Sequence, residues 1–216
     1  LAKLLYPHIK VIGVEPSGAA CMKASLEKGE VVTLPHVNTI ADGTAVQTPG
    51  EHIFSYLQEN LDDVITIDDD ELIVAFLDMV ENHKMIVENS GLLTVAALRH
   101  LNFTGKKVVS ILSGGNMDVI TMSSVVQHGL IQRDRIFTVS VLIPDKPGEL
   151  VRVASIIAEN QGNVIKLDHN QFISTNRYAA VELKVTLEAY GTEHKKKIVK
   201  ALEEAGCKPK IIRANL

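Results

Sequence analysis

Short runs of strand-forming residues alternate with helical stretches through the first half of the chain, and this alternation constrains the fold most. The runs cover residues 11–14, 63–67 and 108–112 and are rich in Val and Ile. Residues 18–28 between the first two have helical character, and Gly29 suits the left-handed position past a helix end. Strands separated by helices predict an α/β fold with a parallel sheet covered on both faces.

Three more helices are predicted along this part of the chain. Asp68 is a suitable N-cap with Glu71 three residues later, so a helix should run from there to about Asn82. Its expected buried face consists of Leu72, Ala75, Phe76, Met79 and Val80. Residues 92–100 form the second helix, and a helix over residues 119–128 is expected to end at Gly129.

A Ser-Gly-Gly-Asn turn, Ser113 to Asn116, directly follows the third strand run. Glycines let the chain turn sharply with a ligand against the backbone, and open α/β sheets bind their ligands at the carboxyl ends of strands. Gly and Asn also serve ordinary turns, so this segment by itself leaves a plain turn open.

Three other segments precede this turn in a fixed order: Val14-Glu15-Pro16, Thr39-Ile40-Ala41-Asp42-Gly43 and Val87-Glu88-Asn89-Ser90-Gly91. In order and spacing, the four segments resemble the C-terminal half of the catalytic domain of pyridoxal-phosphate-dependent threonine and serine dehydratases, a group that includes serine racemases. The resemblance covers about residues 1–122. It implies part of a fold-type-II three-layer domain, similar to tryptophan synthase β, and a pyridoxal 5'-phosphate cofactor.

The resemblance also implies roles for single residues. Ser113 would donate a hydrogen bond to the pyridine nitrogen of the cofactor, and Gly114 and Gly43 would let the backbone approach its ring. Glu88 would lie near the reacting end as a catalytic group. A second interpretation makes Glu88 only a carboxylate at the start of the next helix, where the helix dipole favours negative charge.

The chain is expected to be a piece of a longer polypeptide. It has no initiator methionine, and it contains neither the Ser-Phe-Lys type motif of the family's Schiff-base lysine nor its phosphate-binding run of glycines. The resemblance then implies that the parent is a threonine dehydratase, an ammonia-lyase that converts L-threonine to 2-oxobutanoate and ammonia and perhaps also L-serine to pyruvate. We expect this stretch alone to be inactive. Two alternatives stay open: a serine racemase-like enzyme and a non-catalytic protein that binds amino acids for regulation.

The second half of the chain has a different pattern. A strand with Phe137, Val139, Val141 and Ile143 on one face precedes a helix over residues 150–158, which Gly162 is expected to close. Strands at residues 164–168 and 181–187, a helix that ends at Gly206, and a strand at residues 210–213 complete the set. This order predicts a ferredoxin-like βαββαβ domain.

The turn Asp145-Lys146-Pro147-Gly148-Glu149-Leu150 makes this domain resemble an ACT regulatory domain. The resemblance implies pairing into a homodimer or homotetramer and an amino-acid effector site at Pro147, Gly148, Asn163 and Val164. Pro147 and Gly148 also suit plain strand-to-helix punctuation. The predicted organisation is therefore a catalytic part at residues 1–122, a linker at 123–134 and an ACT-like domain at 135–216.

Composition argues against other classes of function. With 46% hydrophobic residues and a net charge of -4, the 216 residues show no basic footprint for nucleic acid, and the run Lys195-Lys196-Lys197 is typical of a solvated helix face. Apolar stretches are far shorter than the roughly 20 residues of a membrane helix, so no membrane partner is expected. Cys21 and Cys207 lack metal or redox spacing, which favours reduced thiols and a cytoplasmic location.

A cation site at Glu15 is weighed on the racemase branch of the family. There, a glutamate, a backbone carbonyl four residues later and an acidic residue two beyond that hold the ion. This sequence supplies Glu15 and Ala19, but Cys21 replaces the third oxygen ligand that a hard cation prefers. The eight histidines show no paired metal spacing. No metal is therefore predicted.

Overall fold

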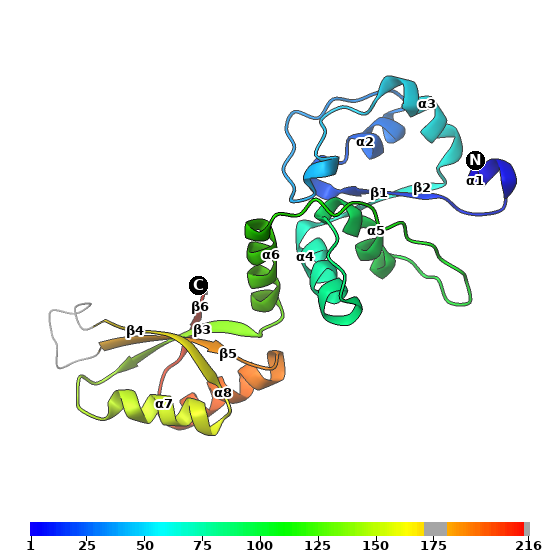
Figure 1. Cartoon of the computed structure of the whole chain (residues 1–216). Helices are drawn as coiled ribbons and strands as arrows, with labels where there is room; N and C mark the ends of the chain where they lie inside the picture. The colour runs from blue at the N-terminus through cyan, green and yellow to red at the C-terminus, as the bar shows by residue number, and fades with distance from the viewer. Residues whose placement is uncertain (171–180, 214–216) are drawn as a thin grey trace. The chain divides into compact units, whose positions relative to one another are not determined.

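The computed structural model describes residues 1–170 and 181–213, which divide into two compact units, Leu1–Val126 and Gln127–Leu216. Figure 1 shows both, and each is described by itself. None of the helices within the described residues has the length and apolar character that a membrane crossing requires.

The first unit is built on a pair of parallel strands, β1 (Ile12–Pro16) and β2 (Asp63–Ile67). Helices α2 (Cys21–Lys28) and α3 (Glu51–Asn60) lie on one side of the pair, and α4 (Asp69–Asp78) and α5 (Leu93–Ala96) lie on the other (Figure 1). The short helix α1 (Ala2–Leu5) precedes β1. The predicted parallel strands with helices on both faces are confirmed for this pair.

Local signals explain how these helices begin and end. Asp68 caps α4 and receives the N3 backbone N–H, while the Glu71 side chain accepts from the Asp68 N–H, as the capping box predicts. Helix α2 ends at Gly29, whose φ is 78°. The structure also contains α3, which the sequence interpretation missed; Phe54 is its buried residue and Gly50 its N-cap.

The helical stretch after the Glu88 turn is made of three short pieces. A 3₁₀ turn, η4 (Asn89–Leu92), leads into α5, and a second 3₁₀ turn, η5 (Ala97–His100), follows it. Similarly, a π-helical turn, η3 (Met79–His83), continues α4. The predicted buried face of α4 is confirmed at four positions, and Val80 is partly buried. Leu72, Phe76 and Leu92 are fully buried in the core of this unit together with Ile67 of β2.

The prediction of a buried strand at residues 108–112 is wrong. The segment is irregular, and the side chains of Val109 and Ile111 are 88% and 72% exposed. Its contacts with α5 are hydrogen bonds at Thr94, whose hydroxyl donates to the Ile111 carbonyl (2.9 Å) and whose carbonyl accepts from the Ser110 hydroxyl (3.0 Å). β-propensity describes how side chains fit a paired, packed strand, and no described residue pairs with this segment.

Helix α6 (Val119–Gln132) does not end at Gly129, contrary to the prediction. Gly129 is buried within the helix, and its carbonyl accepts the N–H of Arg133 at 3.0 Å. The left-handed residue beyond the helix is Asp134, with a φ of 53°. Glycine inside a helix costs only about 1 kcal/mol relative to alanine, which the surrounding packing easily offsets. Residues 123–132 of the predicted linker are thus helical.

The second unit has the predicted βαββαβ order. Its elements are β3 (Ile136–Ile143), α7 (Glu149–Glu159), β4 (Asn163–Asn170), β5 (Val181–Glu188), α8 (Thr192–Glu204) and β6 (Lys210–Ile212). The strands form one antiparallel sheet in the order β4-β5-β3-β6, with α7 and α8 on one face (Figure 1). This is the ferredoxin-like topology.

The core of this unit lies between the sheet and its two helices. Phe137, Val139, Val141 and Ile143 of β3 are buried as predicted. The prediction that Gly162 closes α7 needs correction, because α7 ends at Glu159 and the left-handed residue is Gln161 (φ 62°). Gly162 is small for a packing reason: a Cβ there would lie 2.8 Å from Ile157 Cγ2.

Candidate cofactor site

The Glu88 turn and the Ser113-Gly114-Gly115-Asn116 turn meet in the first unit. Glu88 is partly buried; one of its carboxylate oxygens, Oε2, accepts the N–H of Asn116 at 3.1 Å. The Glu88 N–H lies 3.5 Å from the Gly114 carbonyl, and the Glu88 carbonyl accepts the N–H of Gly91 at 3.0 Å. These contacts hold the carboxylate of Glu88 beside the second turn.

Both predicted glycines lie against this carboxylate. Gly114 has a φ of 77°, and a Cβ there would lie 2.0 Å from Glu88 Cδ. A Cβ at Gly43 would lie 2.9 Å from Ser90 Oγ and 3.6 Å from Glu88 Oε1. Any side chain at Gly114 would therefore displace the carboxylate. The structure thus brings three of the four predicted residues, Glu88, Gly43 and Gly114, into one cluster.

Ser113 completes the cluster through its backbone. Its carbonyl oxygen lies only 1.8 Å from where a Cβ of Gly91 would be, so the close approach of the two turns requires glycine there. The Ser113 residue is exposed, and its hydroxyl makes no hydrogen bond among the described residues. A ligand can therefore reach this residue.

Two polar residues of the Glu88 turn were not predicted to matter. Ser90 Oγ and Asn89 Oδ1 are buried without a hydrogen-bond partner among the described residues. Ser90 lies beside Gly43, whereas Asn89 Nδ2 donates to the Ile40 carbonyl at 3.0 Å. In the sequence, only their position between Glu88 and Gly91 indicated that they could belong to the site. The direction in which each side chain points depends on the folded turn.

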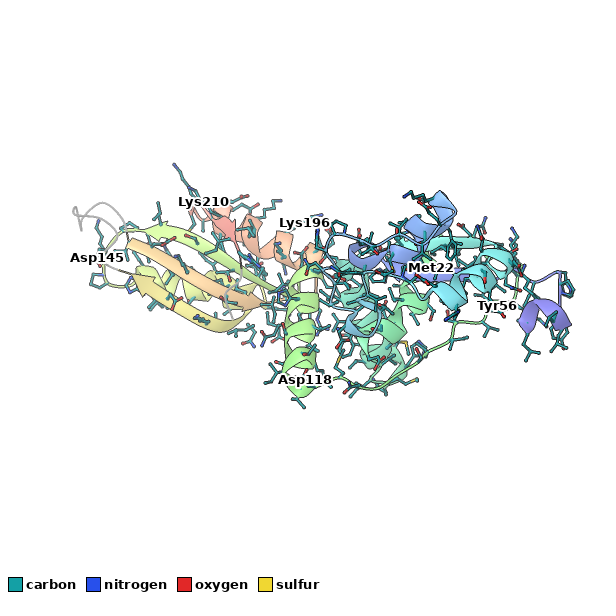
Figure 2. The ribbon with its side chains drawn as sticks, turned by 90° about the horizontal axis from the view of Figure 1, so that it is seen from above. Met22, Tyr56, Asp118, Asp145, Lys196 and Lys210 are labelled. Carbon is teal, nitrogen blue, oxygen red and sulfur yellow. The ribbon has the colours of Figure 1, made fainter. Side chains whose placement is uncertain are left out.

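A cavity of about 400 Å³ lies next to this cluster, and residues of the same three segments line it together with the first turns of α6. Asp42 precedes Gly43, Asn89 follows Glu88, and Asn116 donates its N–H to Glu88, and all three line the cavity. Asp118, directly before α6 (Figure 2), also lines the cavity. The hydroxyl and N–H of Thr121 hold the pKa of Asp118 below its ordinary value. A cavity of this size suits a small ligand.

The carboxylate of Glu15 binds the N-terminal end of α2. Its two carboxylate oxygens accept the N–H groups of Met22 (2.9 Å) and Lys23 (2.8 Å), which lie in the first turn of that helix. Burial and the nearby Glu15 carboxylate raise the pKa of the Cys21 thiol. Residues 1–170 and 181–213 hold no cluster of three metal-ligating side chains.

The four predicted effector residues lie at the two ends of α7. Pro147 and Gly148 precede the helix, and Gly148 is its N-cap with a φ of 93°. Asn163 and Val164 begin β4, beyond the other end; Asn163 Nδ2 donates to Glu188 Oε2 at 3.2 Å. A helix of 11 residues is about 16 Å long. One copy of this unit therefore does not bring the four residues into one pocket.

Comparison with known families identifies the class. The family model described as pyridoxal-phosphate dependent enzyme matches residues 1–114 of the 216, and the chain belongs to this family. The family implies pyridoxal phosphate as the cofactor.

Relatives cover nearly the whole chain. It is 35% identical over 203 residues to an L-threonine ammonia-lyase of Geobacter sulfurreducens, which is 93% of this chain and 50% of that protein. It is 32% identical over 210 residues to an L-threonine dehydratase biosynthetic IlvA of Escherichia coli, which is 95% of this chain and 40% of that protein. The chain thus spans about half the length, or less, of these curated relatives.

Solved structures agree with the fold. The processed form of threonine deaminase isoform 2 from Solanum lycopersicum matches with a TM-score of 0.54 and 34% identity, over 59% of this chain and 38% of that one. Maize serine racemase matches with a TM-score of 0.52 and 33% identity, over 59% and 42%. The fold-type-II assignment is confirmed for the first unit.

The residues of the cluster fit this cofactor. Gly43, Gly114 and Gly91 let their three segments pack closely into one wall, because a side chain at any of them would collide with the cluster itself. The exposed Ser113 hydroxyl is a hydrogen-bond donor suited to a ring nitrogen. The buried Ser90 hydroxyl, which has no partner among the described residues, offers a further polar contact.

Proposed function

We propose that this chain forms one wall of the cofactor site of a threonine ammonia-lyase, which converts L-threonine to 2-oxobutanoate and ammonia and L-serine to pyruvate. The observation that carries the proposal is the cluster of Glu88, Gly43 and Gly114, in which the carboxylate lies against both glycines beside Ser113. The names of the relatives from Geobacter sulfurreducens and Escherichia coli support the choice of threonine.

The chain's own residues would divide the work. Bound pyridoxal phosphate withdraws electrons from the substrate and so makes loss of its α-proton easier. Ser113 would hold the ring nitrogen with a hydrogen bond while keeping its own proton, so the ring would withdraw electrons less strongly than it would beside an aspartate. This moderation favours loss of the β-hydroxyl over proton return to the cofactor.

Glu88 would act at the reacting end. Its Oε2 accepts the Asn116 N–H, whereas Oε1 accepts no hydrogen bond from the described residues and lies 3.6 Å from where a Cβ of Gly43 would be. Oε1 is therefore the atom that would orient the substrate amino group or hold a proton there.

The lysine that binds the cofactor and the glycine run that binds its phosphate are absent from this sequence. We propose that both come from a further part of the parent polypeptide, so the 216 residues alone have no lyase activity. The second unit would pair with another copy, bind an amino-acid effector and control the enzyme, which we place in the cytoplasm.

Product analysis tests the proposal. A polypeptide that carries both the lysine and these 216 residues should release 2-oxobutanoate from L-threonine, and the chain alone should not. Because a serine racemase is among the similar structures, the same protein should be given L-serine and assayed for both pyruvate and D-serine. Mostly D-serine would favour a racemase, and no product from any of these substrates would favour the non-catalytic regulatory alternative.

A further inference from the structure

The loop that carries Gly43 has little regular structure of its own, yet the site depends on its position. Its only helical turn is η2 (Asp42–Thr44), and the buried Ala41 precedes it. A Cβ at Gly43 would come within 2.9 Å of Ser90 Oγ, so a shift of the loop by an ångström would open or close this side of the cluster. Something outside the loop must fix it.

Asp69 holds the loop from the side of α4. Its Oδ2 accepts the Ile40 N–H at 3.0 Å, and its Oδ1 accepts the Thr39 hydroxyl proton at 2.6 Å. The neighbouring Asp68 is the N-cap of the capping box, and its Oδ1 also accepts a hydrogen bond from Ser17 Oγ at 2.5 Å. The carboxylate of Asp69 is therefore not needed to cap the helix. It binds residues 39 and 40 of the Gly43 loop instead.

Asn89 holds the same peptide segment from the side of the Glu88 turn. Its Nδ2 donates to the Ile40 carbonyl at 3.0 Å, and the residue is only 4% exposed. This contact leaves Asn89 Oδ1 buried without a partner among the described residues. A buried unpaired amide oxygen is destabilising, and an apolar side chain of the same size would avoid that cost. The hydrogen bond to the Ile40 carbonyl therefore explains why an asparagine stands at this position.

We infer that Asp69 and Asn89 are positioning residues for the cofactor wall. Together they engage both backbone polar groups of Ile40, its N–H and its carbonyl, three residues before Gly43. Asn89 directly follows Glu88, so the same turn fixes the carboxylate and the loop opposite it. The inference rests on the proposed role of Gly43 beside the cofactor.

The contacts of Asp69 and Asn89 with Ile40 form a clamp on the loop. Amide hydrogen exchange of the 216-residue chain tests this clamp without any cofactor. Asp69→Ala and Asn89→Leu should each speed exchange at Ile40 and Ala41 by about tenfold or more, the factor that corresponds to one lost buried hydrogen bond. Asp69→Asn should restore slow exchange, because its amide oxygen can accept from Ile40 and its amide nitrogen can donate to Thr39. Thr39→Val against Thr39→Ser gives a milder pair if Asp69→Ala does not fold.

Asp63→Ala is the matched control. Asp63 is an exposed carboxylate whose side chain accepts the N–H of the adjacent Val64, so its removal should leave exchange at Ile40 unchanged. Exchange at Ile40 and Ala41 that stays slow in both Asp69→Ala and Asn89→Leu would overturn the clamp.

Cofactor affinity tests the positioning role. In a polypeptide that also carries the lysine, pyridoxal phosphate should bind about tenfold more weakly to Asn89→Leu and Asp69→Ala, and Asp69→Asn should recover the affinity. Faster exchange with unchanged affinity would show that the clamped loop does not position the cofactor. If the unmodified polypeptide bound no cofactor, the proposed function and the positioning role would both fail, and the exchange rates would still decide the clamp.

Discussion

At the residue scale, Glu88 is the side chain around which the candidate site assembles. Resemblance to the dehydratases predicted Glu88, Ser113, Gly114 and Gly43, and the structure places the carboxylate against the two glycines. Asn89 and Ser90 could not be predicted, because alternate residues of a turn point in directions that only the fold determines.

Ser113→Ala should weaken cofactor binding and slow elimination in a polypeptide that carries the lysine. The ring nitrogen would lose its donor, at a cost of about 1 to 3 kcal/mol. Ser113→Asp should instead keep the ring nitrogen protonated and raise transamination relative to elimination. The ratio of the two products from L-threonine measures this effect. An unchanged ratio would show that the Ser113 hydroxyl does not set the course of the reaction.

At the element scale, local signals predicted most of the fold. Strand β2 has the predicted bounds, and the capping box at Asp68 and the left-handed Gly29 are confirmed because each depends on a few neighbouring residues. The prediction of a strand at residues 108–112 was wrong because a strand needs a partner from elsewhere in the chain, and no described segment pairs with these residues. The prediction that α6 ends at Gly129 was wrong because packing along α6 outweighs the small intrinsic cost of glycine in a helix.

One ion pair joins the turn before β3 to α8 and gives a prediction about pH. Asp134 accepts from Lys195 at 2.7 Å and from the Thr192 hydroxyl at 2.8 Å, at the start of α8. These groups, the lysine first, hold the pKa of Asp134 below its ordinary value in the folded state. Its contribution to stability is therefore complete above the unfolded pKa and is lost as pH falls through the folded value.

Asp134→Asn should accordingly lower the free energy of unfolding at neutral pH, and the difference from the unmodified chain should shrink below about pH 4. Asparagine tolerates the left-handed backbone of this position, so the change tests the charge. Glu193→Gln is the control, because its ion pair with Lys196 is exposed and should contribute little. Urea titrations at several pH values measure this; an equal loss at pH 7 and pH 3 would contradict it.

At the scale of the whole molecule, the proposed pairing of the second unit with another copy makes a prediction about its effector site. Its predicted effector residues lie at opposite ends of α7, so a shared pocket would need the Gly148 turn of one copy beside the Val164 strand start of another. Strand β4 is an outer strand of the sheet, and Val164, Ile165 and Leu167 on it are each more than a third exposed. A second copy could cover such an edge.

Isoleucine, valine, threonine and serine should therefore be titrated by calorimetry against residues 135–216 and by reaction rate against the complete enzyme. We expect at least one of them to bind a dimer of the unit and to change the rate. An effector acts only through its different affinities for two states, and such coupling is typically about 1 to 3 kcal/mol. A monomeric unit that binds none of the four, with an enzyme indifferent to all, would reduce this unit to a structural role.

The most direct test of the central claim is whether pyridoxal phosphate forms a covalent linkage with these 216 residues. Mixed with the cofactor and dialysed, the chain alone should keep no absorbance band near about 410–420 nm, because it supplies a wall of the site and no lysine for the cofactor. A polypeptide that also carries the lysine should keep the band and lose it on borohydride reduction. A band that persists in the chain alone and disappears with borohydride would contradict the account.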